Sequence, residues 1–586
     1  MRFTRQAENL GRGLVAVNTG KGVFLSWRFL GTDPEDITFS LYRNGTLIAE
    51  NLSGATNFLD KDGKPGDGYG ITCSLNPYSS SFEDVAQATD KAYIEIPLNR
   101  PADDSLMQGQ TCSYYPNDAS VADLDGDGEY EIILKWDPDN SKDNSQGGIT
   151  GRCYLDAYKL DGTFMWRINL GINIRSGAHY TQFMVYDFDG DGKAEMICKT
   201  SDGSIDGKGN DIGDPSKIYL NTTTGKIMRG NEYLTLFDGE TGEALDTIDF
   251  EPARGSMQSW GDDYANRSER YLGAVAYLDG KTPTCIMSRG YYARTAIAAY
   301  DVVDKKLVMR WKFDTNDSED YKKFGGQGNH NLAVADVDGD GYDELCFGQL
   351  TIDQDGTPLS CTFLGHGDAM HVGDLVLSHQ GIEAWGCLEA TYGGVLWFPF
   401  DATILYRVNG KKDTGRGAAG NFVAGNDSYE FATSDSTDIY DWEGNVLGTW
   451  PKGASVNYAV YWDADLEHEV GDGTKVYSID GKVIFNAEGC TKINGTKSNT
   501  SITADFLGDW REEIMLPTAD GTALRIYVST DLTDVRLFTL MHDIQYRCQV
   551  ASQNVAYNQG ALTSFFLGTG YPLPKMPDIY LAGKGE

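Results

Sequence analysis

The chain has 586 residues and a formal net charge of −37, because 86 acidic side chains outnumber 49 basic ones. An evenly spread surplus of this kind disfavours nucleic acid and anionic lipid surfaces as partners. No apolar run reaches the roughly 18 residues of a membrane-spanning helix, so the sequence predicts no membrane segment. Glycine occurs 69 times and aromatic residues make up 12% of the chain, which favours strands and tight turns.

Most of the chain is organised by an internal repeat of an apolar strand, an acidic loop and a second apolar strand. The clearest copies are VADLDGDGEYEIIL from Val121, VYDFDGDGKAEMIC from Val185 and VADVDGDGYDELCF from Val334. TADFLGDWREEIML from Thr503 keeps the frame with fewer acids. Weaker copies begin at Ala274, Gly373, Gly420 and Ala459.

Each copy is followed by a hairpin-like stretch, such as AYKLDGTFMWRI or VYSIDGKVIF, with an Asp-Gly turn that suits a tight hairpin. Two strands and a hairpin form a four-stranded unit, and the eight copies arranged radially form a propeller. We therefore predict an all-β chain with an eight-bladed β-propeller over residues 101–586. Closure of the last blade by a segment near the N-terminus of the propeller is compatible with this pattern.

Residues 1–98 lack the repeat and contain short alternating strands, among them GVFLSWRFL, ITFSLYRNGTLIAE and AYIEIPL. The dipeptide Asn44-Gly45 predicts a hairpin turn. We expect a small, fibronectin-like β-sandwich here. A polar stretch at residues 100–104 suits a linker to the propeller.

Three acidic loops follow the pattern D-x-D-G-D-G-x-x-E, in which alternate carboxylates converge on one point and glycines permit the curl. Several hard oxygen ligands favour Ca²⁺ over Zn²⁺. The loops are not EF-hands, because the twelfth position is apolar and strands flank the loop. Ions there would mainly join two strands. The expected ligands are Asp123, Asp125, Asp127, Glu131, Asp187, Asp189, Asp191, Glu195, Asp336, Asp338, Asp340 and Glu344.

A second set of polar residues lies near the start of the predicted innermost strands, which line the centre of a propeller. Such residues either cap strands and contact channel water or converge on a ligand. The set comprises Asn117, Asp118, Gln182, His330, Asn331 and His366.

Five long motifs together resemble the rhamnogalacturonan lyases of polysaccharide lyase family 11. They are RQAENLGRGLVAV, YYPNDASVADLDGDGEYEIILKWDP, QGNHNLAVADVDGDG, LGHGDAMHVGD and NGTKSNTSITADFLGDWREE, and the resemblance extends from Arg5 past Tyr557. It implies an eight-bladed propeller with bound calcium and an N-terminal β-sandwich. The implied substrate is rhamnogalacturonan I, an acidic pectic polysaccharide of alternating rhamnose and galacturonate, and the implied reaction is β-elimination.

The same resemblance assigns roles to individual residues. Arg416 and Tyr557 match polar residues near the family's cleft, and Lys497 directly follows the NGT loop that contacts sugar in the family. His330 and His366 resemble centrally placed calcium ligands, although imidazole is an unusual partner for this ion. The residues that match sugar-binding positions are Asn117, Asp137, Asn494, Gly495 and Thr496.

Elimination removes the proton at C5 of galacturonate, which is weakly acidic until the neighbouring carboxylate is neutralised. Our hypothesis is that Lys497 acts as the base, because lysine is far easier to deprotonate than arginine. Arg416 and Ca²⁺ neutralise the carboxylate, and Tyr557 positions the sugar or protonates the leaving oxygen. Which of the three side chains is the base stays open at this point.

Two other functions are compatible with the sequence. A non-catalytic calcium propeller could bind glycans or proteins through the same acidic loops, since fold alone says little about function. A hydrolase could use Asp137 with a second channel acid. The long ordered motifs and the NGTK loop favour the lyase.

We expect endo action, because no insertion is evident near KKDTGRGAAG, while exo action stays open. We also expect a monomer. A polymeric extracellular substrate favours a secreted, cell-surface or periplasmic protein whose signal segment lies outside this sequence. The absence of an apolar signal core near Met1, and cysteines such as Cys198, Cys346 and Cys387 within apolar strands, leave a cytoplasmic location open.

Overall fold

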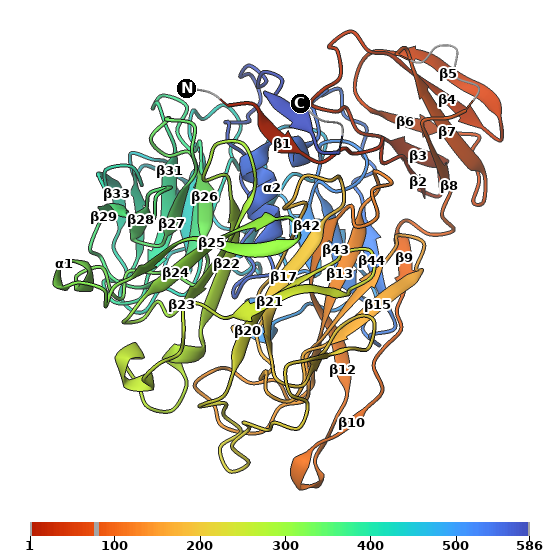
Figure 1. Cartoon of the computed structure of the whole chain (residues 1–586). Helices are drawn as coiled ribbons and strands as arrows, with labels where there is room; N and C mark the ends of the chain where they lie inside the picture. The colour runs from red at the N-terminus through yellow and green to blue at the C-terminus, as the bar shows by residue number, and fades with distance from the viewer. Residues whose placement is uncertain (1–2, 76–80, 584–586) are drawn as a thin grey trace.

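The structure is a computed structural model that describes residues 3–75 and 81–583. Its regular elements are almost all strands, so the prediction of an all-β chain is confirmed (Figure 1). No helix in the described ranges is long and apolar enough to cross a membrane. The helical segments are α1 (Glu319–Lys322), α2 (Ile544–Ala551), η1 (Met107–Gly109), η2 (Met257–Trp260), η3 (Arg267–Glu269), η4 (Gly495–Lys497) and η5 (Leu540–His542).

Two antiparallel sheets form the N-terminal part, and their apolar side chains belong to one core cluster. The predicted turn at Asn44-Gly45 is confirmed, because Arg43 pairs with Thr46 across it. The first sheet contains β2 (Val15–Asn18), β3 (Val23–Ser26) and β6 (Asn57–Asp60), and the second contains β5 (Thr46–Leu52), β4 (Phe39–Arg43), β7 (Gly68–Cys73) and β8 (Asp84–Gln87).

Within the described residues, eight further sheets each contain four consecutively paired antiparallel strands. The first four are β12 (Tyr114–Ala122), β13 (Glu131–Pro138), β14 (Tyr154–Tyr158), β15 (Phe164–Asn169); β16 (Phe183–Tyr186), β17 (Glu195–Ser201), β20 (Glu232–Phe237), β21 (Ala244–Asp249); β22 (Tyr271–Ala276), β23 (Thr284–Arg289), β24 (Ala296–Val303), β25 (Lys306–Asp314); and β26 (Ala333–Ala335), β27 (Glu344–Phe347), β28 (Leu350–Ile352), β29 (Pro358–Cys361).

The remaining four sheets also follow chain order, except that the last strand of the eighth sheet is β9. They are β30 (Gly367–Gly373), β31 (Glu383–Leu388), β32 (Gly394–Trp397), β33 (Ile404–Val408); β34 (Gly417–Gly420), β35 (Glu430–Thr433), β36 (Asp438–Tyr440), β37 (Val446–Thr449); β38 (Tyr458–Val460), β39 (Glu469–Asp472), β40 (Lys475–Tyr477), β41 (Val483–Asn486); and β42 (Ile502–Ala504), β43 (Glu513–Pro517), β44 (Ala523–Tyr527), β9 (Ile94–Pro97).

Short strands complete the fold. The first of the eight sheets is extended by β18 (Ser204–Ile205) and β19 (Asp211–Ile212), and β10 (Asp104–Ser105) pairs with β11 (Thr111–Cys112). Near the two chain ends, β1 (Arg5–Ala7) pairs in parallel with β45 (Ile579–Leu581).

The first strands of successive sheets contact one another. The contacts run from β12 through β16, β22, β26, β30 and β34 to β38, and β12 also contacts β42 of the last sheet. First and second strands such as β12 and β13 are almost entirely buried, whereas the last strand β37 is mostly exposed. Each sheet is therefore covered on both faces at its inner end, as expected when sheets pack side by side around a centre.

One strand differs from the sequence prediction. The segment AYIEIPL was assigned to the N-terminal sandwich, but its β9 pairs antiparallel with β44 of the last sheet. The cause is the free edge of β44, whose backbone groups gain partners from an extended segment that alternates buried and polar side chains. The last sheet is thus completed by residues from before the repeat.

One hydrogen bond recurs at the acidic turns. The glutamate that begins the second strand accepts a hydrogen bond from a backbone amide just after the first strand, which fixes the turn. The pairs are Glu131 with Leu124, Glu195 with Phe188, Glu344 with Val337, Glu383 with Leu375, Glu430 with Phe422, Glu469 with Trp462 and Glu513 with Phe506.

Helix α2 lies in the middle of the molecule and contacts β12, β16, β22 and β26 (Figure 1). All of its residues are buried, so it has no apolar stripe for a sequence pattern to detect. Its polar side chains donate to inner-strand carbonyls instead. The Nε2 of Gln549, for example, donates to the carbonyl of Val372 at 3.0 Å.

A buried ion pair joins this helix to the N-terminal segment. Arg547 of α2 donates from Nε and Nη2 to Glu8 at 2.7 and 2.9 Å, and Tyr130 also donates to Glu8. Burial opposes ionisation of Glu8, but the Arg547 guanidinium outweighs it and lowers the pKa of this carboxyl. The same segment binds the acidic loops, since Arg5 pairs with Asp343 at 2.8 Å.

We predict that Glu8→Ala destabilises the protein by about 3–5 kcal/mol, because Arg547 would be left as an unpaired buried charge. The melting temperature in a thermal scan measures this effect. Glu50→Ala, which removes an exposed carboxylate from β5, is the matched control and should melt like the wild type. Equal melting temperatures for both variants would contradict the importance of the Glu8–Arg547 pair.

Candidate functional site

A cleft of about 500 Å³ opens at the end of the sheets opposite the acidic loops. The predicted residues that line it are Asn117, Asp137, Asn494, Gly495, Lys497 and Tyr557. Two β-bulges re-aim side chains near it, one in β12 between Pro116 and Ala119 and one in β30 between Gly367 and Met370. Residues from distant segments of the chain therefore line one cleft.

The ammonium group of Lys497 lies over the ring of Tyr557, with Nζ 3.3 Å from the ring centroid. Its nearest acid is Asp368, at 3.9 Å between Nζ and Oδ2. Burial lowers the pKa of Lys497 to about 8, and Arg416 adds to that effect while Asp368 opposes it. Because the ammonium is only weakly paired, it is available to a ligand in the cleft.

Arg416 supports the turn that carries Lys497. It precedes β34 and donates from Nη2 to the carbonyl of Thr496 at 3.1 Å and from Nη1 to Asn457 at 3.2 Å. Burial lowers the pKa of Arg416 from its usual value. A guanidinium that remains cationic in this position contributes positive charge beside the cleft.

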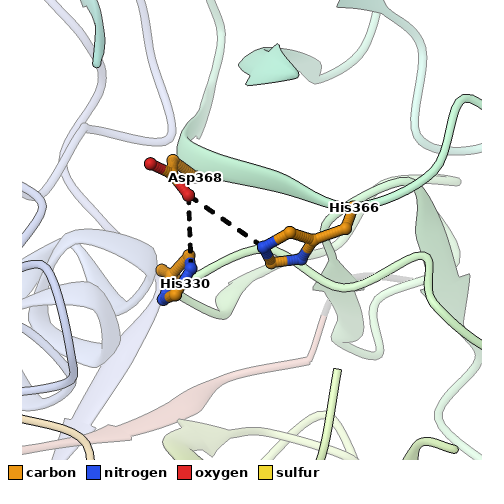
Figure 2. A group of neighbouring side chains, drawn as sticks. All are labelled: His330, His366 and Asp368. Carbon is orange, nitrogen blue, oxygen red and sulfur yellow. Dashed lines mark ion pairs between the residues drawn. The ribbon is translucent and has the colours of Figure 1, made fainter. Parts of the chain in front are cut away.

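His330, His366 and Asp368 form a group whose ligand atoms lie within 4.8 Å of one another (Figure 2). Nε2 of His330 is 3.2 Å from Oδ1 of Asp368, and Nε2 of His366 is 3.2 Å from Oε2 of Glu389. Nδ1 of His366 faces the carbonyl of Gly328 at 2.5 Å, which favours the proton on that nitrogen.

His366 therefore directs a lone pair on Nε2 towards two carboxylates, and this buried nitrogen has no hydrogen-bond partner. Imidazole lone pairs and carboxylates around one point are a donor set for a metal ion. Asp368 is nearly buried, and burial raises its pKa to about 6, an effect that a cation would oppose. The predicted pair of histidines thus meets a carboxylate that the sequence analysis missed.

The predicted sugar-binding residues form one polar wall. Nδ2 of Asn117 donates to Oδ1 of Asn494 at 3.2 Å. Oδ1 of both Asn117 and Asp137 is buried without a hydrogen-bond partner, which leaves acceptors for hydroxyl groups. Gly495 and Thr496 belong to η4, and the Cβ of an alanine at Gly495 would meet open space.

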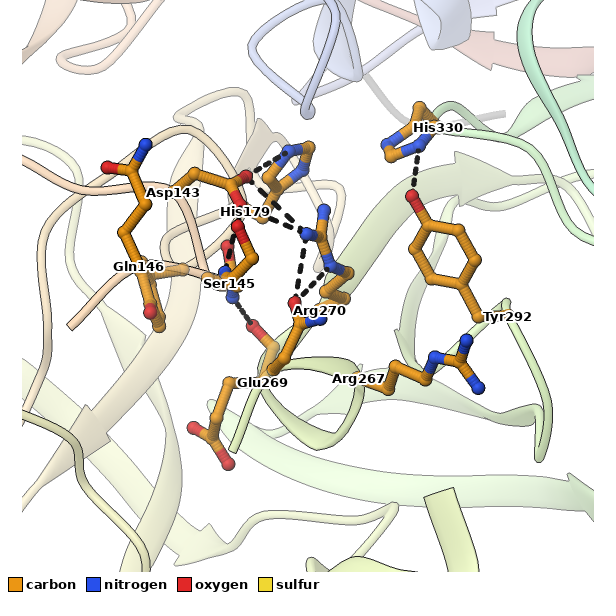
Figure 3. A network of polar contacts seen from close by, with 12 residues as sticks. Asp143, Ser145, Gln146, His179, Arg267, Glu269, Arg270, Tyr292 and His330 are labelled. Carbon is orange, nitrogen blue, oxygen red and sulfur yellow. Dashed lines mark hydrogen bonds and ion pairs between the residues drawn. The ribbon is translucent and has the colours of Figure 1, made fainter. Parts of the chain in front are cut away.

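A second polar network borders the same cleft (Figure 3). Arg270 lies 3.3 Å from Asp143, and Asp143 also accepts from the backbone and hydroxyl of Ser145. Burial opposes ionisation of Asp143, but Arg270 and the two hydrogen bonds from Ser145 together outweigh it, and the pKa falls to about 2. This anchors the wall beside His179, whose ring lies 5.6 Å from that of Tyr557.

The aromatic rings continue towards the histidines. Tyr557 stacks on His330, with ring centroids 4.1 Å apart and planes at 6°. The hydroxyl of Tyr292 lies 3.0 Å from Nε2 of His330. Lys497, Tyr557 and the His330–His366–Asp368 group therefore form one continuous site.

The acidic loops lie at the other end of the inner strands. Three of four expected acids group closely in each loop, as Asp123, Asp125 and Asp127; Asp187, Asp189 and Glu195; and Asp336, Asp338 and Glu344. Asp191 and Asp340 accept hydrogen bonds from backbone amides within their own loops at 2.9 Å. Glu131 faces the ammonium of Lys159 at 3.6 Å.

A fourth acidic group, which the sequence analysis missed, contains Asp463, Asp465 and Glu469. It lies in the weak repeat copy from Ala459, whose D-x-D spacing was the available signal. Crowding is evident in the second loop, where burial and neighbouring carboxylates raise the pKa of Asp187 to about 7 and of Glu195 to about 9. A bound dication would relieve this repulsion.

All ten cysteines are free thiols, and Cys198, Cys346 and Cys387 are fully buried as expected. The surrounding strands explain this, since a thiol packs there as a small apolar group.

Comparison with known proteins gives the same family at both ends of the chain. Residues 93–577 match the family model "Rhamnogalacturonan lyase family 11, C-terminal domain", and residues 5–87 match "Rhamnogalacturonan I lyases beta-sheet domain". The chain is 48% identical to the rhamnogalacturonan exolyase YesX of Bacillus subtilis, over 99% of the chain and 98% of the relative. It is 47% identical to the rhamnogalacturonan endolyase YesW of the same species, over 98% of the chain and 93% of that relative.

Solved structures agree with these matches. The crystal structure of the exotype lyase YesX superposes with a TM-score of 0.95 at 47% identity, covering 99% of this chain and all of that one. The structure of a family 11 rhamnogalacturonan lyase from Bacillus licheniformis superposes with a TM-score of 0.94 at 47% identity, covering 98% of this chain and all of that one.

We predict that Lys159→Met raises the calcium affinity of the first acidic loop about tenfold. The Lys159 ammonium contacts Asp125 and Asp127 there and must be displaced by an incoming ion. Calcium retained after dialysis at limiting calcium, measured by elemental analysis, reports the change. Lys312→Met is the control, because the ammonium of Lys312, on β25 of another sheet, pairs with Glu251 at 3.4 Å. Equal retention in both variants would refute the competition.

Proposed function

Because the chain belongs to rhamnogalacturonan lyase family 11, we propose that it cleaves the rhamnose–galacturonate bond of rhamnogalacturonan I by β-elimination. The observation that carries this proposal is the weakly paired Lys497 ammonium over Tyr557, beside Arg416, in the cleft of a strongly acidic protein. These cations provide the local reversal of charge that an anionic polymer needs in order to bind.

In the proposed reaction, the neutral amine of Lys497 takes the proton from C5 of galacturonate. The electron pair of that bond forms the C4–C5 double bond, and the bond from C4 to O4 breaks. Tyr557 protonates the departing O4 or positions the ring, so the products are an unsaturated uronate and a free hydroxyl. Arg416 stabilises the negative charge that develops on the carboxylate.

We further propose that His330, His366 and Asp368 hold a calcium ion. The unpartnered Nε2 of His366 and the shared carboxylate of Asp368 support a cation at this point. When bound, calcium would neutralise the uronate carboxylate and increase the acidity of C5. Two imidazoles are unusual donors for calcium, so metal analysis is the decisive check of identity.

The eight sheets are proposed to be the blades of one β-propeller, formed by residues from 101 onwards together with β9, and the two N-terminal sheets, from β2 to β8, are proposed to be a small β-sandwich. The contacts between successive first strands, and between β12 and β42, support a closed ring. Ions in the acidic loops are proposed to be calcium that joins strands. The protein is proposed to be a monomer that is secreted or held at the cell surface or in the periplasm, where polymeric pectin is accessible.

Endo action is the proposed mode of cleavage. A second hollow shares Thr518 and Ala519 with the cleft and lies against the outer strands β44 and β9 of the last sheet. This supports room for a polymer to continue beyond the cleaved bond. Relatives at 48% and 47% identity include both an exolyase and an endolyase, so identity alone does not set the mode.

We predict that Lys497→Ala lowers turnover of rhamnogalacturonan I by at least about 100-fold, because the base is lost. The rate of rise in ultraviolet absorbance from the unsaturated product measures turnover. Lys475→Ala, which removes an exposed lysine from β40, should act as the wild type does. If the wild type released reducing ends without a rise in absorbance, it would be a hydrolase. If it gave neither reducing ends nor absorbance, it would be a binding protein.

We predict that His366→Gln and Asp187→Asn separate the two kinds of metal group. His366→Gln should lower turnover about 100-fold with little change in melting temperature, because it alters the cleft. Asp187→Asn should lower the melting temperature in calcium while turnover stays within about twofold, since its loop is remote. The proposal fails if the two variants exchange these effects, or if wild-type protein depleted of calcium remains folded and fully active.

A further inference from the structure

Asp118 lies next to the predicted sugar-binding residue Asn117, in the bulge of β12, and is almost fully buried at 1% exposure. Its Oδ2 accepts a hydrogen bond from the ammonium of Lys135, a side chain that is completely buried. Its Oδ1 accepts from Nδ2 of Asn494 at 2.9 Å and from Nδ2 of Asn558 at 2.8 Å. One carboxylate thus has three donors from three segments.

Two of these segments carry the reacting side chains of the proposed function. Asn494 is the N-cap of η4, the turn that ends in Lys497. Asn558 directly follows Tyr557. The two asparagines are also joined to each other, since Nδ2 of Asn494 donates to Oδ1 of Asn558 at 2.6 Å.

Both loops have unfavourable backbone conformations. Asn494 and Ser498 flank the Lys497 turn with φ of 54° and 61°, and Ala556 and Asn558 flank Tyr557 with φ of 49° and 50°. Non-glycine residues rarely adopt this left-handed region, and they remain there only where the surrounding structure holds them. The hydrogen bonds to Asp118 are such a restraint for two of the four.

We propose that Asp118, held by Lys135, is a positioning residue that sets the contact between the Lys497 ammonium and the Tyr557 ring. Asp118 does not itself reach the substrate, because it is buried behind Asn494. Its charge matters as well as its shape, since a carboxylate accepts from one ammonium and two amides at once. This inference rests on the proposed function, in which Lys497 and Tyr557 act on one sugar.

The test compares steady-state kinetics of Asp118→Asn and Asn558→Gly with the wild type on rhamnogalacturonan I. Asn558→Gly removes one tether while glycine tolerates the left-handed backbone, so this variant folds even if Asp118→Asn does not. We expect each folded variant to lose about 10- to 100-fold in kcat, with KM changed less than about threefold, because the reacting groups are displaced while sugar contacts remain.

Asn44→Gly is the matched control, because Asn44 has φ of 50° and lies in the remote turn between β4 and β5. It should leave kcat and KM unchanged. A kcat for Asn558→Gly within twofold of the wild type, or a rise in KM alone, would overturn the inference. Absence of unsaturated product from the wild type would instead overturn the proposed function, so the two failures are distinguishable.

Discussion

The candidate site depends on a lysine ammonium that is kept weakly paired among acids. Lys497 lies 3.3 Å from the centroid of the Tyr557 ring and 3.9 Å from its nearest carboxylate oxygen, in a chain with a net charge of −37. An aromatic face stabilises a cation without neutralising it. The ammonium therefore remains available to a uronate or, once deprotonated, to its C5 proton.

The architecture makes this arrangement possible. The inner strand β12 begins at the cleft and ends at an acidic turn, so one strand supplies polar residues to the site and a fixed turn at the opposite face. At that face, the recurrent glutamate fixes the turn through a backbone amide, and Glu8 joins Arg547 of the central helix to the N-terminal segment. The glutamate–amide hydrogen bond and the Glu8–Arg547 ion pair both hold in place the strands that carry the cleft.

The sequence was informative wherever chemistry was local. Alternating acids and glycines predicted the acidic turns, and Asn44-Gly45 predicted its hairpin, because each pattern acts within a few residues. Long motifs led to Lys497 and Tyr557, although their contact spans 60 positions of sequence and needed the structure. Asp368 lies within the motif LGHGDAMHVGD, but a bulge in β30 decides where its side chain points.

Other features had no local signal. Helix α2 is buried on every side and so lacks a helical apolar stripe. The pairing of β9 with β44 depends on which strand edge is free after the other sheets have formed. The bond from Lys135 to Asp118, and the place of Lys159 among loop carboxylates, are set by neighbouring strands and not by nearby sequence.

The most direct measurement is a crystal structure of an inactive Lys497→Ala variant, with calcium and a bound rhamnogalacturonan oligosaccharide. We expect a galacturonate over Tyr557, with its carboxylate towards Arg416 and His366 and its C5 within about 3.5 Å of the position vacated by the lysine nitrogen. An oligosaccharide bound elsewhere on the ring, or a galacturonate whose C5 faces away from that position, would contradict it.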